Sequence, residues 1–188
     1  MGQGGTPPRG AGRKGVLIAL LERVDGSAFT VAEGTMWKKI RKYRAGKHAS
    51  AEERNVLGLA LQACETQCSA LVFSRDRDGD VGRERKLERG IQRARELFPN
   101  LEMIGGVAVE NIEAWILVLL GYPGERLSPN KTKPELEARG IATLDDKLAV
   151  VAKSRLDEVP PGSLRNWLEN ARDVFARTDA CRSSAGPK

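Results

Sequence analysis

Residues 69–80 read Ser-Ala-Leu-Val-Phe-Ser-Arg-Asp-Arg-Asp-Gly-Asp, and this stretch decides the fold. An apolar run that ends in a turn predicts a buried strand. Acids at the carboxyl end of such a strand lie where open α/β sheets bind ligands. The acids here are Asp76, Asp78 and Asp80, and carboxylates this close repel one another unless a cation separates them. Oxygen ligands suit Mg²⁺, Mn²⁺ or Ca²⁺, so the stretch predicts a metal-assisted site.

Two other interpretations of the acids were weighed. A calcium-binding EF-hand loop that begins at Asp76 needs glycine at its sixth position and glutamate at its twelfth. This chain has Val81 and Leu87 there, which argues against that loop. The other interpretation is a polar turn in which the acids pair with Arg75, Arg77 and Arg83, and it stays open.

The composition restricts the class of protein. Among 188 residues, 40% are hydrophobic and 30% are charged, as in ordinary globular proteins. A net charge of +6 favours anionic partners such as nucleic acid, although a merely basic surface explains it equally well. Cys64 and Cys68 have no second Cys or His pair to complete a zinc site. The sequence shows no signal peptide, and the apolar run at 116–120 is too short to cross a bilayer. We expect a cytoplasmic protein without a membrane partner.

The order of the elements predicts the architecture. Apolar periodicity and turn residues predict helices at 16–24, 50–67, 82–98 and 110–120, and strands at 29–32, 70–73 and 101–109. Ser50 and Glu53 predict a capping box at the start of the second helix. This alternation is typical of a parallel α/β sheet. From residue 128 only helices follow, at 134–139, 145–152 and 163–176. We therefore expect an α/β domain at 1–124, a helical C-terminal appendage at 125–178 and a flexible tail at 179–188.

A basic segment precedes the second helix. It combines six Lys or Arg residues with Trp37 and Tyr43 in residues 37–48. Cations with interleaved aromatic rings favour contact with nucleic-acid phosphates and bases. The predicted nucleic-acid contacts are Lys38, Lys39, Arg41, Lys42 and Arg44. A solvated surface is the alternative.

A second acidic pair follows the strand at 101–109. Glu110 and Glu113 are three residues apart, so they share a helix face. In the first turn of a helix, acids interact favourably with the helix dipole, which is one interpretation. The other is that one of them, Glu113 foremost, faces Asp76 and Asp78 from the neighbouring strand end.

The stretch at 70–80, together with Gly-Gly-Val-Ala-Val-Glu-Asn-Ile-Glu-Ala-Trp-Ile-Leu at 105–117, resembles the Toprim-like uncharacterised bacterial proteins of the DUF4276 type. The resemblance covers residues 1–120. It implies a Toprim-like parallel-sheet core with flanking helices, related to the catalytic domain of topoisomerases and primases. It also implies that Asp76 and Asp78 match the family's Asp-x-Asp pair, which holds Mg²⁺ or Mn²⁺. It further implies that the protein binds nucleic acid.

The chain departs from that family at its start. Toprim domains carry a Glu-Gly motif at the end of their first strand, where the glutamate is the general acid/base. Gln3-Gly4 aligns best with that motif, and the strand before it is missing or truncated in this sequence. An amide hydrogen-bonds but does not transfer a proton at neutral pH. Either the coding start lies further upstream, or this chain retains binding without catalysis.

Two functions follow as expectations. The first is a Mg²⁺-dependent nuclease, in the setting of phage defence that the resemblance implies. Its catalytic residues are Asp76, Asp78 and Glu113, its metal ligands are Asp76 and Asp78 with Asp80 in support, and Glu110 is an additional acid. The second is a catalytically inactive Toprim-like module that binds or regulates.

Overall fold

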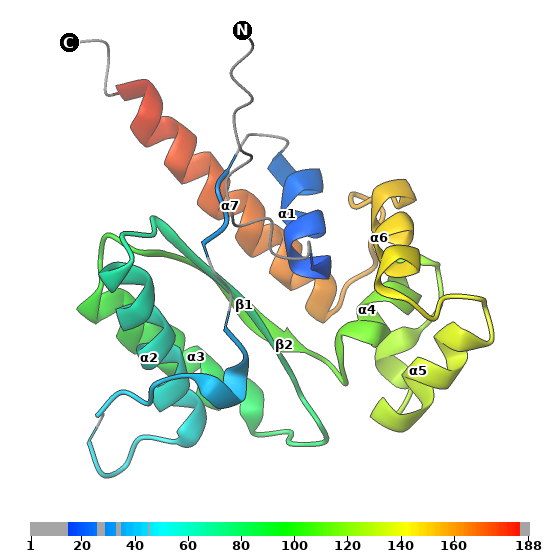
Figure 1. Cartoon of the computed structure of the whole chain (residues 1–188), viewed down its shortest axis with the longest axis horizontal. Coiled ribbons are helices and arrows are strands. Elements are labelled where there is room, and N and C mark those ends of the chain that lie inside the picture. The colour runs from blue at the N-terminus through cyan, green and yellow to red at the C-terminus, as the bar shows by residue number, and fades with distance from the viewer. Residues whose placement is uncertain (1–14, 26–28, 33–34, 45, 185–188) are drawn as a thin grey trace, which may run out of the picture.

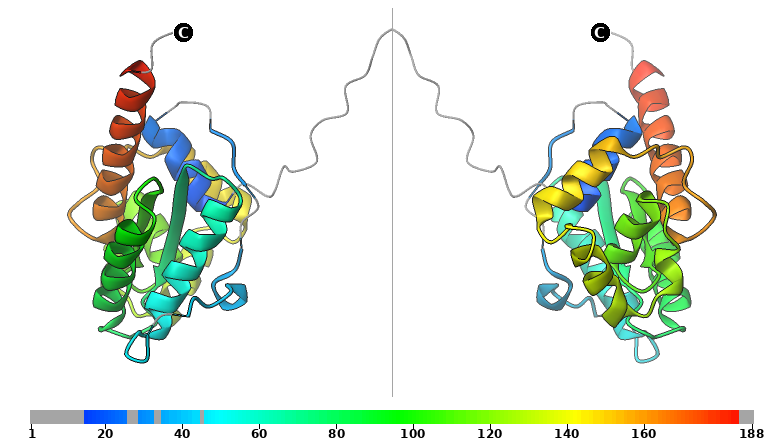
Figure 2. Two further views of the ribbon diagram at one scale, coloured as in Figure 1. Left: turned by 90° about the vertical axis from the view of Figure 1, so that its left-hand side faces the viewer. Right: turned by 90° about the vertical axis from the view of Figure 1, so that its right-hand side faces the viewer.

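The computed structural model describes residues 15–25, 29–32, 35–44 and 46–184. Within them the chain forms a mixed α/β fold, in which a small parallel sheet lies between two groups of helices (Figures 1 and 2). The elements in chain order are α1 Val16–Asp25, the 3₁₀ helix η1 Trp37–Lys39, α2 Ala51–Glu65, β1 Ala70–Asp76, α3 Arg83–Leu97, β2 Glu102–Ala108, α4 Ile112–Leu119, the 3₁₀ helix η2 Gly124–Arg126, α5 Pro129–Glu137, α6 Leu144–Lys153 and α7 Ser163–Ser184.

The sheet of the described residues has two strands. β1 and β2 are parallel and paired from Ala70 with Glu102 to Asp76 with Ala108, and α3 is the crossover between them. A Cβ atom on Gly105 would lie 2.3 Å from the ring of Phe73, so glycine is required for that ring to cover the neighbouring strand. Because the strands are parallel, the loops that leave Asp76 and Ala108 emerge at the same edge of the sheet.

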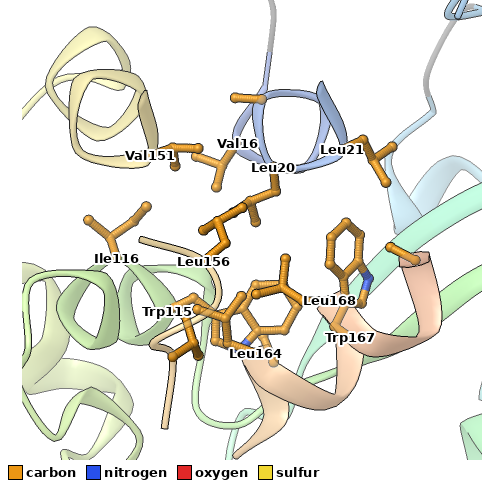
Figure 3. Packing of buried hydrophobic residues seen from close by; sticks show 14 of the residues in the cluster. Val16, Leu20, Leu21, Trp115, Ile116, Val151, Leu156, Leu164, Trp167 and Leu168 are labelled. Atoms are coloured by element: carbon orange, nitrogen blue, oxygen red, sulfur yellow. The ribbon is translucent and has the colours of Figure 1, made fainter. Parts of the chain in front are cut away.

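Each face of the sheet has its own hydrophobic core. On one face, α2 and α3 pack with Phe73 and Met103, and Leu87 and Val56 are almost fully buried. On the other, α1, α4, α6 and α7 surround Trp115 and Trp167, whose ring centroids are 5.7 Å apart (Figure 3). The C-terminal helices therefore share a core with α1, α4 and β2.

Several predicted elements are confirmed, and two differ. The capping box of Ser50 and Glu53 starts α2, and β1, α3 and β2 form where they were predicted. The strand predicted at 29–32 is absent, because Phe29 packs instead on Phe175 of α7, with ring centroids 6.2 Å apart. Helix α7 extends to Ser184, past the predicted start of the tail, since no glycine or proline interrupts 163–184.

The motif expected at Gln3-Gly4 and the domain boundary expected at residue 124 are not tested by the described residues. Gln3-Gly4 and the remainder of residues 1–14 lie outside the described residues. The domain boundary at 124 stays a prediction. Among the described helices, none is both long and apolar enough to cross a membrane.

The contact between α2 and the basic segment gives a first testable prediction. A Cβ atom on Gly58 would lie 2.1 Å from the Arg41 carbonyl oxygen, so only glycine lets the segment cross α2 there. Gly58→Ala should lower the free energy of unfolding by about 1–3 kcal/mol, the usual cost of overpacking, despite the better helix propensity of alanine. Urea denaturation measures this. The control is Gly46→Ala, where a Cβ meets nothing within 4 Å, and a stabilised Gly58→Ala variant contradicts the contact.

Candidate functional site

The site lies at the edge of the sheet where both strands end. The acid loop, residues 76–82, leaves β1, and residues 109–111 leave β2 and lead into α4. The two are joined through the backbone, because the Arg77 N–H donates to the Ala108 carbonyl at 3.1 Å. Asp78 (φ 49°) and Glu110 (φ 67°) both adopt the left-handed conformation, which is costly for glutamate and concentrates at functional sites.

Asp78 and Asp80 are each paired with cations. The Asp78 carboxylate accepts from Arg83 at 2.8 Å and from Arg75 at 3.2 Å. Asp80 forms an ion pair with Lys86 at 2.9 Å and accepts from the Gly82 N–H, and Lys86 foremost holds the pKa of Asp80 below its ordinary value. For these two acids the structure has the cation-paired polar turn that the sequence left open. Their predicted metal-binding roles stay predictions.

Arg83 fixes the conformation of the acid loop. Its guanidinium donates to the backbone carbonyls of Asp76 and Arg77, the latter at 2.7 Å, in addition to the Asp78 carboxylate. Its Nε also lies 3.0 Å from Glu52 of α2. Arg83 begins α3, so the crossover helix itself holds the loop that precedes it.

Asp76 differs from the other acids of the loop, because no ion pair within 4.0 Å is found for it among the described residues. It is half-buried, and the backbone N–H of Ile112, at the start of α4, favours its charged form and so lowers its pKa slightly. Burial, and then the negative charges of Asp78 and Glu113, raise the pKa of Asp76 above its ordinary value, and the positive charge of Arg75 opposes them. A half-buried carboxylate with a raised pKa at a strand end is a candidate for chemistry.

The two acids that follow β2 have separate roles. Glu113 contributes to the negative potential at Asp76, and Lys147 of α6 forms an ion pair with it at 2.6 Å. Glu110 is buried and forms an ion pair with Arg77, which ties the two strand-end loops together. That Glu113 faces the Asp76 site stays a prediction, and the charge of Glu113 is near enough to raise the pKa of Asp76. Glu110 therefore holds the acid loop in place through Arg77.

Glu52, which was not predicted as a site residue, connects the basic segment to the acid loop. Its side chain is buried at the start of α2, where it accepts from the Trp37 indole at 3.0 Å and lies near Arg75 and Arg83. The guanidinium of Arg75 also lies 5.7 Å from the centroid of the Trp37 ring. Acids are common in the first turn of a helix, so the sequence holds no signal for Glu52. Its burial in the fold is what sets it apart from other such acids.

The five cations predicted to contact nucleic acid lie on the segment that crosses α2. Lys38, Lys39, Arg41, Lys42 and Arg44 are all exposed. The structure places them on the α2 side of the sheet, whereas Glu113 and Lys147 lie on the α4 and α6 side. Trp37, Glu52 and Arg83 link the basic segment to the acid loop.

The donor set determines which kind of metal site fits. Among the described residues, no group of three or more Asp, Glu, His or Cys side chains is arranged to hold a metal ion. Mg²⁺ needs no such cage, because it is usually held by one or two carboxylates, with water and substrate phosphate as the remaining ligands. The pKa of Asp76 is raised first by burial and then by the negative charges of Asp78 and Glu113, and a bound cation would relieve the repulsion between these carboxylates. The carboxylates of Asp76 and Glu113 are oxygen donors of the kind that an open Mg²⁺ or Mn²⁺ site uses.

Comparison of the chain with protein-family models, with curated proteins and with solved structures gave no match.

Proposed function

We propose that this protein is a Toprim-like, Mg²⁺- or Mn²⁺-dependent nuclease whose centre is Asp76 with Glu113. The observation that carries the proposal is the Asp76 carboxylate. It is half-buried at the carboxyl end of β1, forms no ion pair with the described cations, and has a pKa raised by burial, Asp78 and Glu113. Leaving such repulsion in place costs stability, which is expected where the charges serve a reaction.

The residues of the chain have the following parts in this proposal. Asp76 and Glu113 hold the metal ion, which on binding would neutralise charge on the phosphoryl group and orient water. Lys147 orients Glu113 through its hydrogen bond at 2.6 Å, and the Ile112 N–H favours the charged form of Asp76. Arg83 fixes the loop that carries Asp76 and Asp78 through its bonds to the loop carbonyls. Asp78, which accepts from Arg83 and Arg75, would add negative charge beside the metal ion.

The substrate class follows from charge. The chain carries a net charge of +6, and Lys38, Lys39, Arg41, Lys42 and Arg44 are exposed on one segment. Basic surfaces attract the phosphates of nucleic acids and release their counterions. A phosphodiester is also the substrate that a carboxylate-held Mg²⁺ serves. Nucleic acid is therefore the proposed substrate.

A metal titration tests the centre. Saturating Mg²⁺ or Mn²⁺ should raise the Tm of the wild type, because a ligand that binds the folded state stabilises it by about 2.7 kcal/mol at a hundredfold excess over Kd. For a chain of this size that is about 5–10 °C. Asp76→Asn should lose the shift, whereas the exposed control Asp157→Asn should retain it.

The same proteins are then incubated with single- and double-stranded DNA and RNA in Mg²⁺. Cleavage by the wild type and by Asp157→Asn, but not by Asp76→Asn, supports the proposal. Equal metal shifts in the wild type and in Asp76→Asn contradict the Asp76 site. A metal shift without cleavage of any of the four substrates contradicts the nuclease.

One observation favours the inactive module as a second candidate. The predicted metal ligands Asp78 and Asp80 already have cationic partners in Arg83, Arg75 and Lys86. A protein that retained the fold for binding alone would have little need to keep those carboxylates free. This candidate predicts nucleic-acid binding that is insensitive to Asp76→Asn.

A further inference from the structure

A cleft of about 820 Å³ lies between the basic segment and α2. We call it the basic groove. One wall is residues 35–44, which contribute four cations, and the other is the outer face of α2. The residues of the groove that the argument uses are Lys39, Arg41, Lys42, Arg44, Tyr43 and Gln62. Sequence analysis assigned phosphate contacts to the segment, but it did not predict a concave site.

The wall formed by the basic segment is held in place along its length. Ile40 is buried in the core beneath α2, and the Arg41 carbonyl lies where a side chain on Gly58 would be. The Tyr43 N–H donates to the Arg54 carbonyl of α2 at 3.2 Å. Trp37 is anchored by its indole bond to Glu52. The groove is therefore a formed cleft, and most of its ordering cost has been met on folding.

The charge of the groove is strongly unbalanced. Lys39, Arg41, Lys42 and Arg44 form no ion pair with any acid in the part of the chain that the structure describes. Glu65 is the one acid among the residues that line the cleft. Four exposed cations against a single carboxylate make a site for an anion with more than one charge. The spread of these cations over the segment favours a chain of phosphates over a single phosphate.

The shape of the groove distinguishes a single strand from a duplex. Its volume lies in the range of about 300–1,000 Å³ that holds drug-sized ligands, so it takes about one or two nucleotides. A cleft of this size favours a single strand over the paired strands of a duplex. Tyr43, whose half-buried side chain packs against the core beneath α2, is among the residues that line the cleft, and so is Gln62 of α2. Cationic grooves with aromatic rings are typical of proteins that bind single strands.

We propose that the basic groove binds single-stranded nucleic acid through Lys39, Arg41, Lys42 and Arg44, with Tyr43 against a base, and that this binding needs no metal ion. The proposal rests on the proposed function in one respect, since it names the form of that function's nucleic-acid substrate. The binding itself is independent of Asp76, because the groove lies on α2 and not at the strand ends.

Fluorescence anisotropy with a labelled 12-nucleotide oligo(dT) in EDTA tests the groove. The wild type should bind the strand, and Lys39→Glu with Lys42→Glu should weaken binding by about tenfold or more at low salt. The slope of log K against log salt should fall by about 1.4, since each phosphate contact to a single strand contributes about 0.7. The control, Lys131→Glu with Lys153→Glu, makes the same charge change on exposed residues of α5 and α6 and should retain the wild-type slope.

The outcomes separate this proposal from the proposed function. Binding in EDTA by both the wild type and Asp76→Asn, without cleavage in Mg²⁺, supports the groove and contradicts the nuclease. A metal shift that depends on Asp76, without oligonucleotide binding in EDTA, contradicts the groove alone. Equal weakening by the two double variants overturns the groove as well. A duplex of the same length that binds as tightly as the single strand contradicts the proposed substrate form.

Discussion

Asp76→Asn is expected to lower the rate of Mg²⁺-dependent cleavage by about 10²- to 10⁴-fold, the range typical of a single catalytic group. It should also raise stability at neutral pH by about 1 kcal/mol, the size of common stabilising substitutions. The reason is that burial, Asp78 and Glu113 all oppose the ionised Asp76 carboxylate. Replacing it with a neutral amide of the same shape removes that repulsion and the proposed metal ligand together.

The pH dependence of this stability gain follows from the raised pKa of Asp76. A group whose pKa is higher in the folded state binds its proton more tightly there, so it stabilises the fold most when protonated. That contribution is fully present below the unfolded pKa and is lost as the pH rises through the folded pKa. The stability of Asp76→Asn relative to the wild type should therefore grow with rising pH across that interval and vanish in acid.

Urea denaturation of the wild type and Asp76→Asn between pH 3 and pH 8 measures the difference. The control is Asp80→Asn, which removes a carboxylate whose pKa is lowered, chiefly by Lys86, so its loss should be neutral or destabilising at neutral pH. If Asp76→Asn is less stable than the wild type at pH 7, the ionised Asp76 carboxylate does not lower the free energy of unfolding. Retained cleavage by this variant contradicts its place in the centre.

Local sequence patterns were sufficient for the elements that position the site. The capping box of Ser50 and Glu53 depends on residues three apart, and it forms as predicted. The apolar run before Asp76 is short and ends in a glycine turn, so β1 and its carboxyl-end acids were predictable. The strand predicted at 29–32 does not form, because a strand needs a neighbouring strand to pair with. Phe29 instead packs against the ring of Phe175 on α7.

The partners of the acids were beyond sequence reasoning, because they come from distant elements. Lys147 is 34 residues from Glu113, and Arg77 is 33 residues from Glu110. Spacing alone treats Asp76 and Asp78 alike, yet in the fold only the carboxylate of Asp78 forms ion pairs with Arg83 and Arg75. The basic groove was hidden for the same reason, since its second wall is the face of α2 beside Gly58.

Trp167→Ala is expected to cost about 3–5 kcal/mol, the usual range for removing a buried tryptophan. Trp167 is 2% exposed, contacts Trp115, and donates its indole N–H to the Phe73 carbonyl of β1 at 3.2 Å. The alanine variant loses the ring contacts and leaves that carbonyl without its partner inside the core. Against a typical total of about 5–15 kcal/mol, this brings the protein near the limit of folding.

The same substitution tests the boundary predicted at residue 124. Because Trp167 of α7 bonds directly to β1, unfolding of the C-terminal helices should expose one face of the sheet. Urea denaturation of Trp167→Ala should then show one transition, shifted to lower urea, by both far-ultraviolet circular dichroism and tryptophan fluorescence. Trp167→Phe retains a ring and should lose less stability, and Trp37→Ala, at a half-buried position, should lose less than Trp167→Ala. Two separate transitions, with α2, α3 and the sheet still folded after the first, would instead mean that residues 125–178 form the separate appendage that the sequence predicted.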